Sequence, residues 1–491
     1  MKLANESAKI RRGFAYAGLG LFFVAATAIW VPTLIGQGRG GGGGARTDAP
    51  TRDWTQDMQM KIMEPFTLAS VGDMIILRPA SNLDDPGFQG ALKIIRSADI
   101  GFGNFESLIR DETHFEGPLG GMFGTKEVAA DVKAMGFQVV NRAGNHLMDS
   151  NQEGLFDTLR FMEQAGLVYG GAGRDLEDAR AAHFYESPKG RIGVVGMYGN
   201  IGGQQGRLDA TYRVGNTGGR PGLNAINLTR SIIVSPDQLD VLKKIRDSVY
   251  EHRTEYSNPV ELPTDRSATQ LDLFGEEYVA EDKAGQQIYT MNPGDLKDTL
   301  RSIRNGKEYS YFMIATIHAH QGATELQQWL FEDTTPDFLV TLAHDAIDNG
   351  ADAFVGHGPH VLKGIEIYKG KPIFYDLGEF FREWDWGCDC DTNPESPQTP
   401  AERNLKYGVT AREVNYESAI AVSKYDKGKL QEVLLYPMDG GFDAPISRRG
   451  VPRMASPEVA QRILQRLQKL SEPFGTKISI EGNVGVIHVA Q

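Results

Sequence analysis

Apolar segments that end in polar residues, and that alternate with amphipathic segments, constrain the fold of this chain most. The segment FTLASVGD ends at Asp73, ADIGFGNFE ends at Glu106, and GFQVVNRAGNH ends at Asn145 and His146. Stretches with helical spacing of apolar residues accompany them, for example QEGLFDTLRFMEQAG over residues 152–166. Such alternation predicts an α/β fold, in which layers of helices cover a sheet.

Two further apolar segments end in histidines. YSYFMIATIHAHQG places His318 and His320 two residues apart, on one face of a predicted strand. DAFVGHGPH ends in His357 and His360. Glycines on both sides of His357 allow a sharp backbone turn, and the proline before His360 fixes it, so both imidazoles can face one point.

Residues at the carboxyl ends of neighbouring strands meet at one edge of a sheet. Carboxylate, imidazole and amide oxygen together suit Mn, Fe, Zn or Mg, and a carboxylate can bridge two such ions about 3.5–4 Å apart. The sequence therefore predicts a centre of two divalent metal ions. Each residue also has a simpler explanation: Asp73 as a helix N-cap, Glu106 as a surface residue, and the histidines as structural core residues.

Length and charge limit the classes of function. The 491 residues are enough for two or three domains, or for one large domain with insertions. A net charge of −13 argues against broad nucleic-acid binding, which needs a basic face, but it is compatible with a local basic pocket for an anionic substrate. The two cysteines, Cys388 and Cys390, form no disulfide framework; incidental thiols, a strained bridge and metal ligands all remain open.

The first 36 residues have the form of a signal peptide or a membrane anchor. Lys9, Arg11 and Arg12 precede an apolar run over residues 13–36, which is about long enough to span a bilayer. A buried helix of a soluble protein is the alternative. We expect export, with the protein in the periplasm or anchored in the inner membrane facing the periplasm.

The remaining chain divides into three predicted parts. Residues 37–65 form a Gly-rich linker, residues 66–385 the main domain with an insertion at about 201–310, and residues 386–491 a C-terminal extension with strands and one polar helix.

The chain resembles the CapA family of poly-γ-glutamate capsule synthesis proteins. The motifs that carry this resemblance are SVGDMIIL, GNFES, AGNHLMDSNQEGLFDTLRFMEQAGLVYGGAGR, GRPGLN, IATIHAH and GADAFVGHGPHVLKGIEIYKGKPIFYDLGEFF. The last is the most specific, and the match runs from about residue 66 to 381. The resemblance implies a calcineurin-like metallophosphoesterase fold, a four-layer α/β sandwich.

The resemblance also implies roles for these positions. Asp73 and His360 would hold one metal ion, and Glu106 would bridge to the second. The second ion would be held by Asn145, His318 and His357. His146 would be catalytic, protonating a leaving oxygen or stabilising the transition state.

Three other positions are left with more than one interpretation. His320 is a ligand, a hydrogen-bond partner of a ligand, or a substrate contact. Arg220, in GRPG, is an anion contact or an ordinary loop residue. Glu379 either tunes the site or caps a helix.

The chain departs from ordinary calcineurin-like enzymes in two places. Ile75 stands where they have a histidine, and Glu106 stands where they have an aspartate. These departures belong to the whole family and put ordinary phosphoesterase activity in doubt.

The function implied is that of an exported, metal-dependent hydrolase-type protein in the synthesis or processing of a capsule polymer. Its partners would be an anionic polymer or phosphoester substrate, and in one alternative a membrane-bound polymer synthase that it assists without catalysis. A periplasmic phosphoesterase unrelated to capsule is the other alternative. No nucleic-acid partner is expected.

Overall fold

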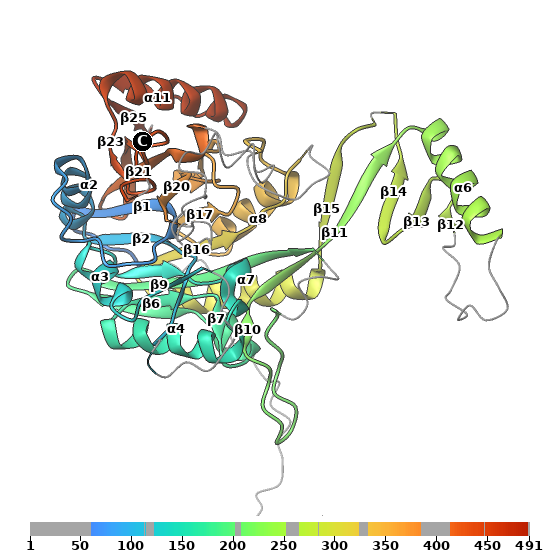
Figure 1. Cartoon of the computed structure of the whole chain (residues 1–491), viewed down its shortest axis with the longest axis horizontal. Coiled ribbons are helices and arrows are strands. Elements are labelled where there is room, and N and C mark those ends of the chain that lie inside the picture. The colour runs from blue at the N-terminus through green and yellow to red at the C-terminus, as the bar shows by residue number, and fades with distance from the viewer. Residues whose placement is uncertain are drawn as a thin grey trace, which may run out of the picture. The chain divides into compact units, whose positions relative to one another are not determined.

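The computed structural model describes most of the chain after residue 59 (Figure 1). The described residues are 60–111, 113, 122–201, 208–251, 265–282, 284–323, 332–383, 413–445 and 447–489. The predicted signal or anchor, most of the predicted linker, and Cys388 and Cys390 lie outside them. Among the helices in these ranges, none has the length and apolar character needed to cross a bilayer.

Two large sheets form the framework. The first runs in the order β24 (Ser479–Glu481), β25 (Val484–His488), β22 (Lys429–Asp439), β21 (Glu417–Asp426), β1 (Phe66–Ile75), β2 (Ile100–Phe105), β5 (Val139–Asn141) and β6 (Val168–Gly170). Strands β20 (Glu379–Arg382) and β23 (Arg453–Met454) pair with β1 and β22. The strands from β1 to β6 are parallel, whereas β21 is antiparallel to β1.

The second sheet follows the order β12 (Asp265–Ser267), β13 (Gln270–Leu273), β14 (Glu276–Ala280), β11 (Ala225–Val234), β9 (Gly190–Ile201), β16 (Phe312–His318), β17 (Ala353–His357), β19 (Lys371–Phe374) and β18 (Ile365–Tyr368). Strand β15 (Gln287–Met291) pairs with β11, and β8 (His183–Ser187) pairs with β9. Two-stranded sheets join β7 (Ala172–Gly173) to β10 (Gly222–Leu223), and β3 (Leu108–Ile109) to β4 (Phe123–Gly124).

Helices cover the outer faces of both sheets. The α-helices are α2 (Pro86–Ser97), α3 (Val128–Ala134), α4 (Asn151–Ala165), α5 (Leu176–Arg180), α6 (Pro236–Glu251), α7 (Pro293–Glu308), α8 (Asp337–Asp348) and α11 (Pro457–Ser471). Short 3-10 helices are η1 (Asn145–Met148), η3 (Glu413–Tyr416) and η4 (Glu472–Phe474).

The period-2 alternation of side chains explains how the layers stack. On β1, Phe66 and Leu68 enter the core between the two sheets, whereas Val71 packs beneath α2, α3 and α4. On β16, Ile314 enters the same central core, and Met313 packs beneath α7 and α8. Because both faces of the central strands β1, β2, β16 and β17 are buried, these strands are mostly apolar. The predicted four-layer α/β sandwich is confirmed.

Part of the predicted insertion belongs to the sandwich itself. Strand β11 pairs in parallel with β9 from Ala225 to Leu228, and then with β14 from Ser231 to Val234. Figure 1 shows β11 and β15 leading from the main sheet to β12–β14 and α6, which surround a small core of their own. Helix α7 packs on β9 and β16. The sequence interpretation recognised α6 but not that α7 and β11 complete the sheet layer.

The C-terminal residues add strands to the first sheet. Strand β21 lies directly beside β1, with Phe66 opposite Tyr425, and β22 and β25 follow. The helix of this extension, α11, begins at the N-cap Ser456, with Pro457 at its first position, and buries one apolar face. The predicted boundary near residue 385 lies outside the described residues.

Candidate metal centre

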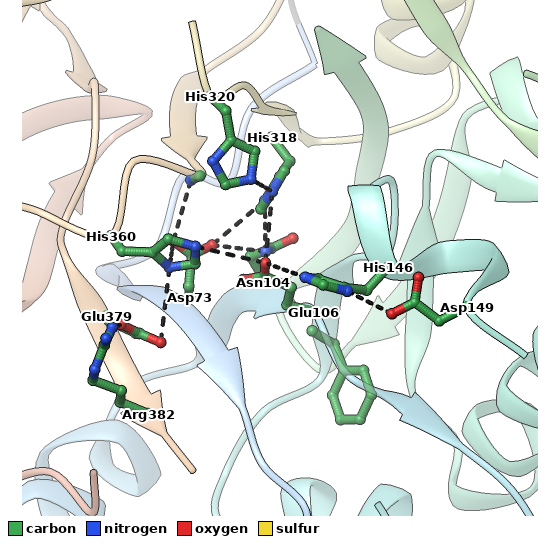
Figure 2. Close-up of polar contacts among 12 residues, drawn as sticks. Asp73, Asn104, Glu106, His146, Asp149, His318, His320, His360, Glu379 and Arg382 are labelled. Atoms are coloured by element: carbon green, nitrogen blue, oxygen red, sulfur yellow. Dashed lines mark hydrogen bonds and ion pairs between the residues drawn. The ribbon is translucent and has the colours of Figure 1, made fainter. Parts of the chain in front are cut away.

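Asp73, Glu106, His318 and His360, four of the six predicted metal ligands, gather where strands of the two sheets end (Figure 2). Asp73 lies near the end of β1, and Glu106 directly follows β2. From the second sheet, His318 ends β16 and His357 ends β17. Asp73, Glu106 and His318 therefore meet at one buried point between the sheets, and His357 lies outside this group.

The loop after β17 turns as its glycines require. Gly358 has a φ of 120°, a conformation that side chains with a Cβ rarely adopt. A Cβ on Gly356 would lie 2.4 Å from the carbonyl oxygen of Tyr375. His360 itself has a φ of 57°, which is unusual for a residue other than glycine. The turn also brings the Gly358 N–H to Asp73, to which it donates a hydrogen bond of 3.1 Å.

Two groups of three residues that could hold a metal ion share one carboxylate, that of Glu106. One group is Asp73, Glu106 and His318, and the other is Glu106, His320 and His360. Within each group the ligand atoms all lie within 4.8 Å of one another. Glu106 belongs to both groups, as the bridging role that the family resemblance implies for it would require.

The division of the other ligands differs from that implied by the resemblance. The resemblance pairs Asp73 with His360. The two groups of close ligand atoms instead combine Asp73 with His318, and His360 with His320. His360 Nδ1 is nonetheless 3.6 Å from Asp73 Oδ2, and His318 Nδ1 is 3.6 Å from Asp73 Oδ1. Which ion each residue would hold stays a prediction. His320, left open by the sequence, lies among the ligands, with its Nε2 2.9 Å from His318 Nε2.

Buried polar atoms with no hydrogen-bond partner provide the test of fit for metal ions. Both carboxylate oxygens of Glu106 and both ring nitrogens of His357 are buried and form no hydrogen bond with the described residues. The amide oxygen of Asn145 is in the same state. A buried polar atom without a partner is costly, and a cation supplies the missing interaction. The donor set therefore fits hard or borderline divalent ions, although Asn145 and His357 lie outside the two compact groups.

Burial and the neighbouring side chains together give the two carboxyls opposite protonation tendencies. Burial, followed by the negative charges of Asp73 and Glu379, raises the pKa of Glu106 well above its usual value. Burial also acts to raise the pKa of Asp73, but the hydrogen bond to His318 and the charge of His360 outweigh it and lower the pKa. Metal ions would favour the ionised form of both carboxyls.

Burial favours the neutral, metal-binding form of His320, His357 and His360. Burial lowers the pKa of His357 to about 4 and that of His360 to about 3. Burial, together with the charges of His318 and His360, lowers the pKa of His320 well below its usual value. A neutral imidazole offers a lone pair, so metal binding at neutral pH needs no prior loss of a proton from these rings.

His146 lies at the edge of the centre with a carboxylate behind it. Its Nδ1 is 2.6 Å from Asp149 Oδ2, and its Nε2 is 3.8 Å from Glu106 Oε1 (Figure 2). A quarter of the His146 side chain is exposed, whereas Glu106 is fully buried. Asp149 thus orients the ring so that Nε2 faces the ligand cluster, as expected of a group that exchanges protons with a substrate.

Residues that the sequence interpretation missed hold the ligands in place. Asn104 Nδ2 donates to Asp73 Oδ1 at 2.7 Å and lies 3.0 Å from His318 Nδ1, while its own oxygen accepts from Asn141. Arg142 donates to the backbone carbonyls of Phe105 and Glu106 at 3.2 and 3.4 Å. Such partners fix ligand orientation.

Two residues named from the sequence lie in clear positions. Glu379 belongs to strand β20, pairs with Arg382, and lies 3.7 Å from His360 Nδ1, so the helix-cap alternative for it is wrong. Arg220 donates hydrogen bonds of 2.9 and 2.6 Å to the backbone carbonyl of Asp209. Its predicted role as an anion contact stays a prediction.

Comparison with known proteins identifies the family of this chain. The model of the family described as bacterial capsule synthesis protein PGA_cap matches residues 67–383. The chain is 38% identical to the uncharacterized protein y4sH of Sinorhizobium fredii, over 89% of this chain and 96% of that protein. It is 23% identical to the capsule biosynthesis protein CapA of Bacillus anthracis, over 66% of this chain and 61% of that protein. The PGA biosynthesis protein CapA of Bacillus subtilis is also 23% identical, over 64% of this chain and 63% of its own length.

The family model spans the strands that carry every described ligand, from β1 to β20. The sandwich that it covers is a calcineurin-like metallophosphoesterase fold. The chain therefore belongs to the bacterial capsule synthesis protein PGA_cap family.

Proposed function

We propose that this protein is an exported, metal-dependent hydrolase that processes a capsule polymer or a related anionic exopolymer. The observation that carries the proposal is the sharing of Glu106 by two groups of metal-ligand types. A bridging carboxylate is the usual feature of dinuclear hydrolytic centres. Family membership adds the link to capsule synthesis.

The residues of this chain divide the chemical work. Asp73, Glu106, His318, His320 and His360 would hold two divalent ions. Such ions, when bound, polarise a phosphoryl or carbonyl oxygen and make water a better nucleophile at neutral pH. The same chemistry serves a phosphoester and the amide of a γ-glutamyl chain.

His146 supplies the proton that the leaving group needs. Its Nδ1 faces Asp149, so the proton to be transferred sits on Nε2, on the side of the ligand cluster. Asp149 keeps the ring in orientation through this contact. Asn104 and Arg142 keep Asp73 and the Glu106 segment in position while this happens.

The test combines metal content with turnover. The purified protein is loaded with Mn, Zn, Fe or Mg and its metal content is analysed. It is then assayed with a chromogenic phosphodiester and with γ-glutamyl peptides. We expect about two ions per chain, as a bridged centre requires. His146→Ala should keep both ions and lose turnover by about a hundredfold or more.

The alternatives give different results in the same experiment. A non-catalytic partner of a polymer synthase would bind metal, turn over neither substrate, and purify with a membrane-bound synthase. A phosphoesterase unrelated to capsule would cleave the phosphodiester but leave γ-glutamyl chains intact. A chain that binds no metal under any loading condition would refute the hydrolase proposal.

A further inference from the structure

A cavity with an apolar floor lies at the edge of the sandwich opposite to the metal centre. Its volume is about 290 Å³, and its walls come from both sheets. Phe66 and Phe312, which begin β1 and β16, line it, whereas Asp73 and His318 lie near the other ends of these strands. Since a strand rises about 3.3 Å per residue, the cavity and the centre are roughly 20 Å apart.

Two hairpin turns with the same sequence form the rim of the cavity. The β18–β19 turn carries Lys369-Gly370-Lys371, and the β21–β22 turn carries Lys427-Gly428-Lys429. In both turns the first lysine and the glycine have positive φ, of 53° and 74° in one and 50° and 69° in the other. These are the two central residues of a tight type I′ hairpin, so each turn holds its lysines at a fixed place.

Positive charge exceeds negative charge around this cavity. Lys61, Lys369, Lys371 and Lys429 line it, with Asp352 as the acidic residue among its lining residues. Lys371 and the neighbouring Lys307 share Asp352, and Lys369 pairs with Asp348. Neither Lys61 nor Lys429 forms an ion pair with any residue that the structure describes. Two ammonium groups are thus available in a chain whose net charge is −13.

The pKa of the neighbouring Lys307 reflects the positive charges around the cavity. Burial lowers the pKa of Lys307, and the attraction of Asp352 is opposed by the positive charges of Lys371 and Lys61. Ammonium groups so close together repel one another, and an anion placed between them relieves that repulsion.

The floor of the cavity is apolar. Ile62, Phe66, Phe312 and Leu430 line it and are buried, and Tyr311 at the rim is 43% exposed. A recess with an apolar floor and an ammonium rim suits a ligand that alternates methylene groups with carboxylates. It suits a flat anionic lipid surface less well, because a bilayer meets protruding charges and not a recessed floor.

We propose that this cavity binds a strand of an acidic, peptide-like polymer. Carboxylates of the strand pair with Lys61 and Lys429, and its methylene groups lie over Phe66 and Phe312. The site is separate from the metal centre and holds the polymer without reacting with it. Because its charges belong to residues far from Glu106, its function does not depend on the hydrolase proposal.

The test measures binding of a labelled γ-linked glutamate oligomer by fluorescence anisotropy. The protein is first depleted of metal, so that the metal centre does not contribute. Lys61→Gln combined with Lys429→Gln removes the two ammonium groups that have no ion pair. The matched control is Lys93→Gln combined with Lys297→Gln, two exposed lysines on α2 and α7.

We expect binding that weakens with salt and becomes about five- to tenfold weaker in the cavity variant, with the control unchanged. Metal content and turnover should be the same in both variants, which separates this site from the proposed centre. Equal affinity in the cavity variant and the control would overturn the proposal. Binding to vesicles of anionic phospholipid, lost in the cavity variant, together with no binding of the oligomer would overturn it in favour of a membrane-facing site.

Discussion

Replacing Glu106 by glutamine should change the stability of the protein in opposite directions with and without metal. Glu106 is fully buried, and neither of its oxygens has a hydrogen-bond partner among the described residues. The charges of Asp73 and Glu379 disfavour its ionised form further. In the metal-free protein this carboxyl is therefore a liability, which glutamine removes while keeping the shape of the side chain.

The sizes of the two effects follow from burial and from ligand sharing. A glutamine here would also lack hydrogen-bond partners, but it carries no charge, and burying an unpaired charge costs more than burying a neutral amide, so metal-free Glu106→Gln should be more stable by about 1 kcal/mol or more. A metal ion that is present at a free concentration of about a thousand times its dissociation constant stabilises the folded protein by about 4 kcal/mol. Since Glu106 belongs to both ligand groups, its loss should remove most of that gain.

Thermal unfolding with and without a chelator measures both effects: the change in stability of the metal-free protein and the stabilisation by metal. The metal-free variant should melt a few degrees above the metal-free wild type, because about 1 kcal/mol shifts the melting temperature by about 2–4 °C in a chain of 150–250 residues and by less in a longer one. The rise in melting temperature on adding metal should be much smaller in the variant than in the wild type. Glu281→Gln, at an exposed position, is the matched control. A metal-free variant that is less stable than wild type, or an unchanged rise with metal, would refute this reasoning.

Three further predictions concern single positions. Asp149→Asn should lower turnover by about tenfold to a hundredfold and shift its pH profile while metal content stays constant, because Asp149 orients His146; loss of metal would contradict this role. Gly72→Ala should destabilise the fold by about 3 kcal/mol or more, measured by denaturant unfolding, because the new Cβ would lie 1.7 Å from the Gly378 carbonyl oxygen. Burial raises the pKa of Asp209 from 3.8 to about 6, so the folded state carries the cost of its ionised form above pH 6. Asp209→Asn should therefore stabilise the protein at neutral pH, with a gain that fades as pH falls from 6 to 3.8, and a gain independent of pH would argue against this.

The strand ends were predictable because their pattern is local. Asp73, Glu106, His318 and His357 each end or follow an apolar run, and parallel strands bring such positions to one edge. This local pattern does not predict which ligands come together, because that depends on how the two sheets face each other. For this reason His320, two residues beyond His318, could not be assigned from the sequence.

Supporting residues were missed for a different physical reason. Asn104 lies inside β2, where a polar residue in an apolar run carries no sign of the partner that it will meet on another strand. Asp149 follows His146 by three residues, which matters only because a short 3-10 helix brings them together. Strand β11 was overlooked because its partner β9 lies in the main domain, and pairing across a long loop leaves no local pattern.

The position of the metal centre between the two sheets makes it a reporter of how often the sandwich opens. Asp73 and Glu106 come from one sheet, and His318 and His360 from the other. Gly358, whose amide donates a hydrogen bond to Asp73, follows it by 285 positions in the sequence. Apart from these ligands, the sheets are joined mainly by apolar packing. Two bound ions would therefore link the two sheets, so the rate of exchange with a labelled metal should rise under conditions that separate the layers.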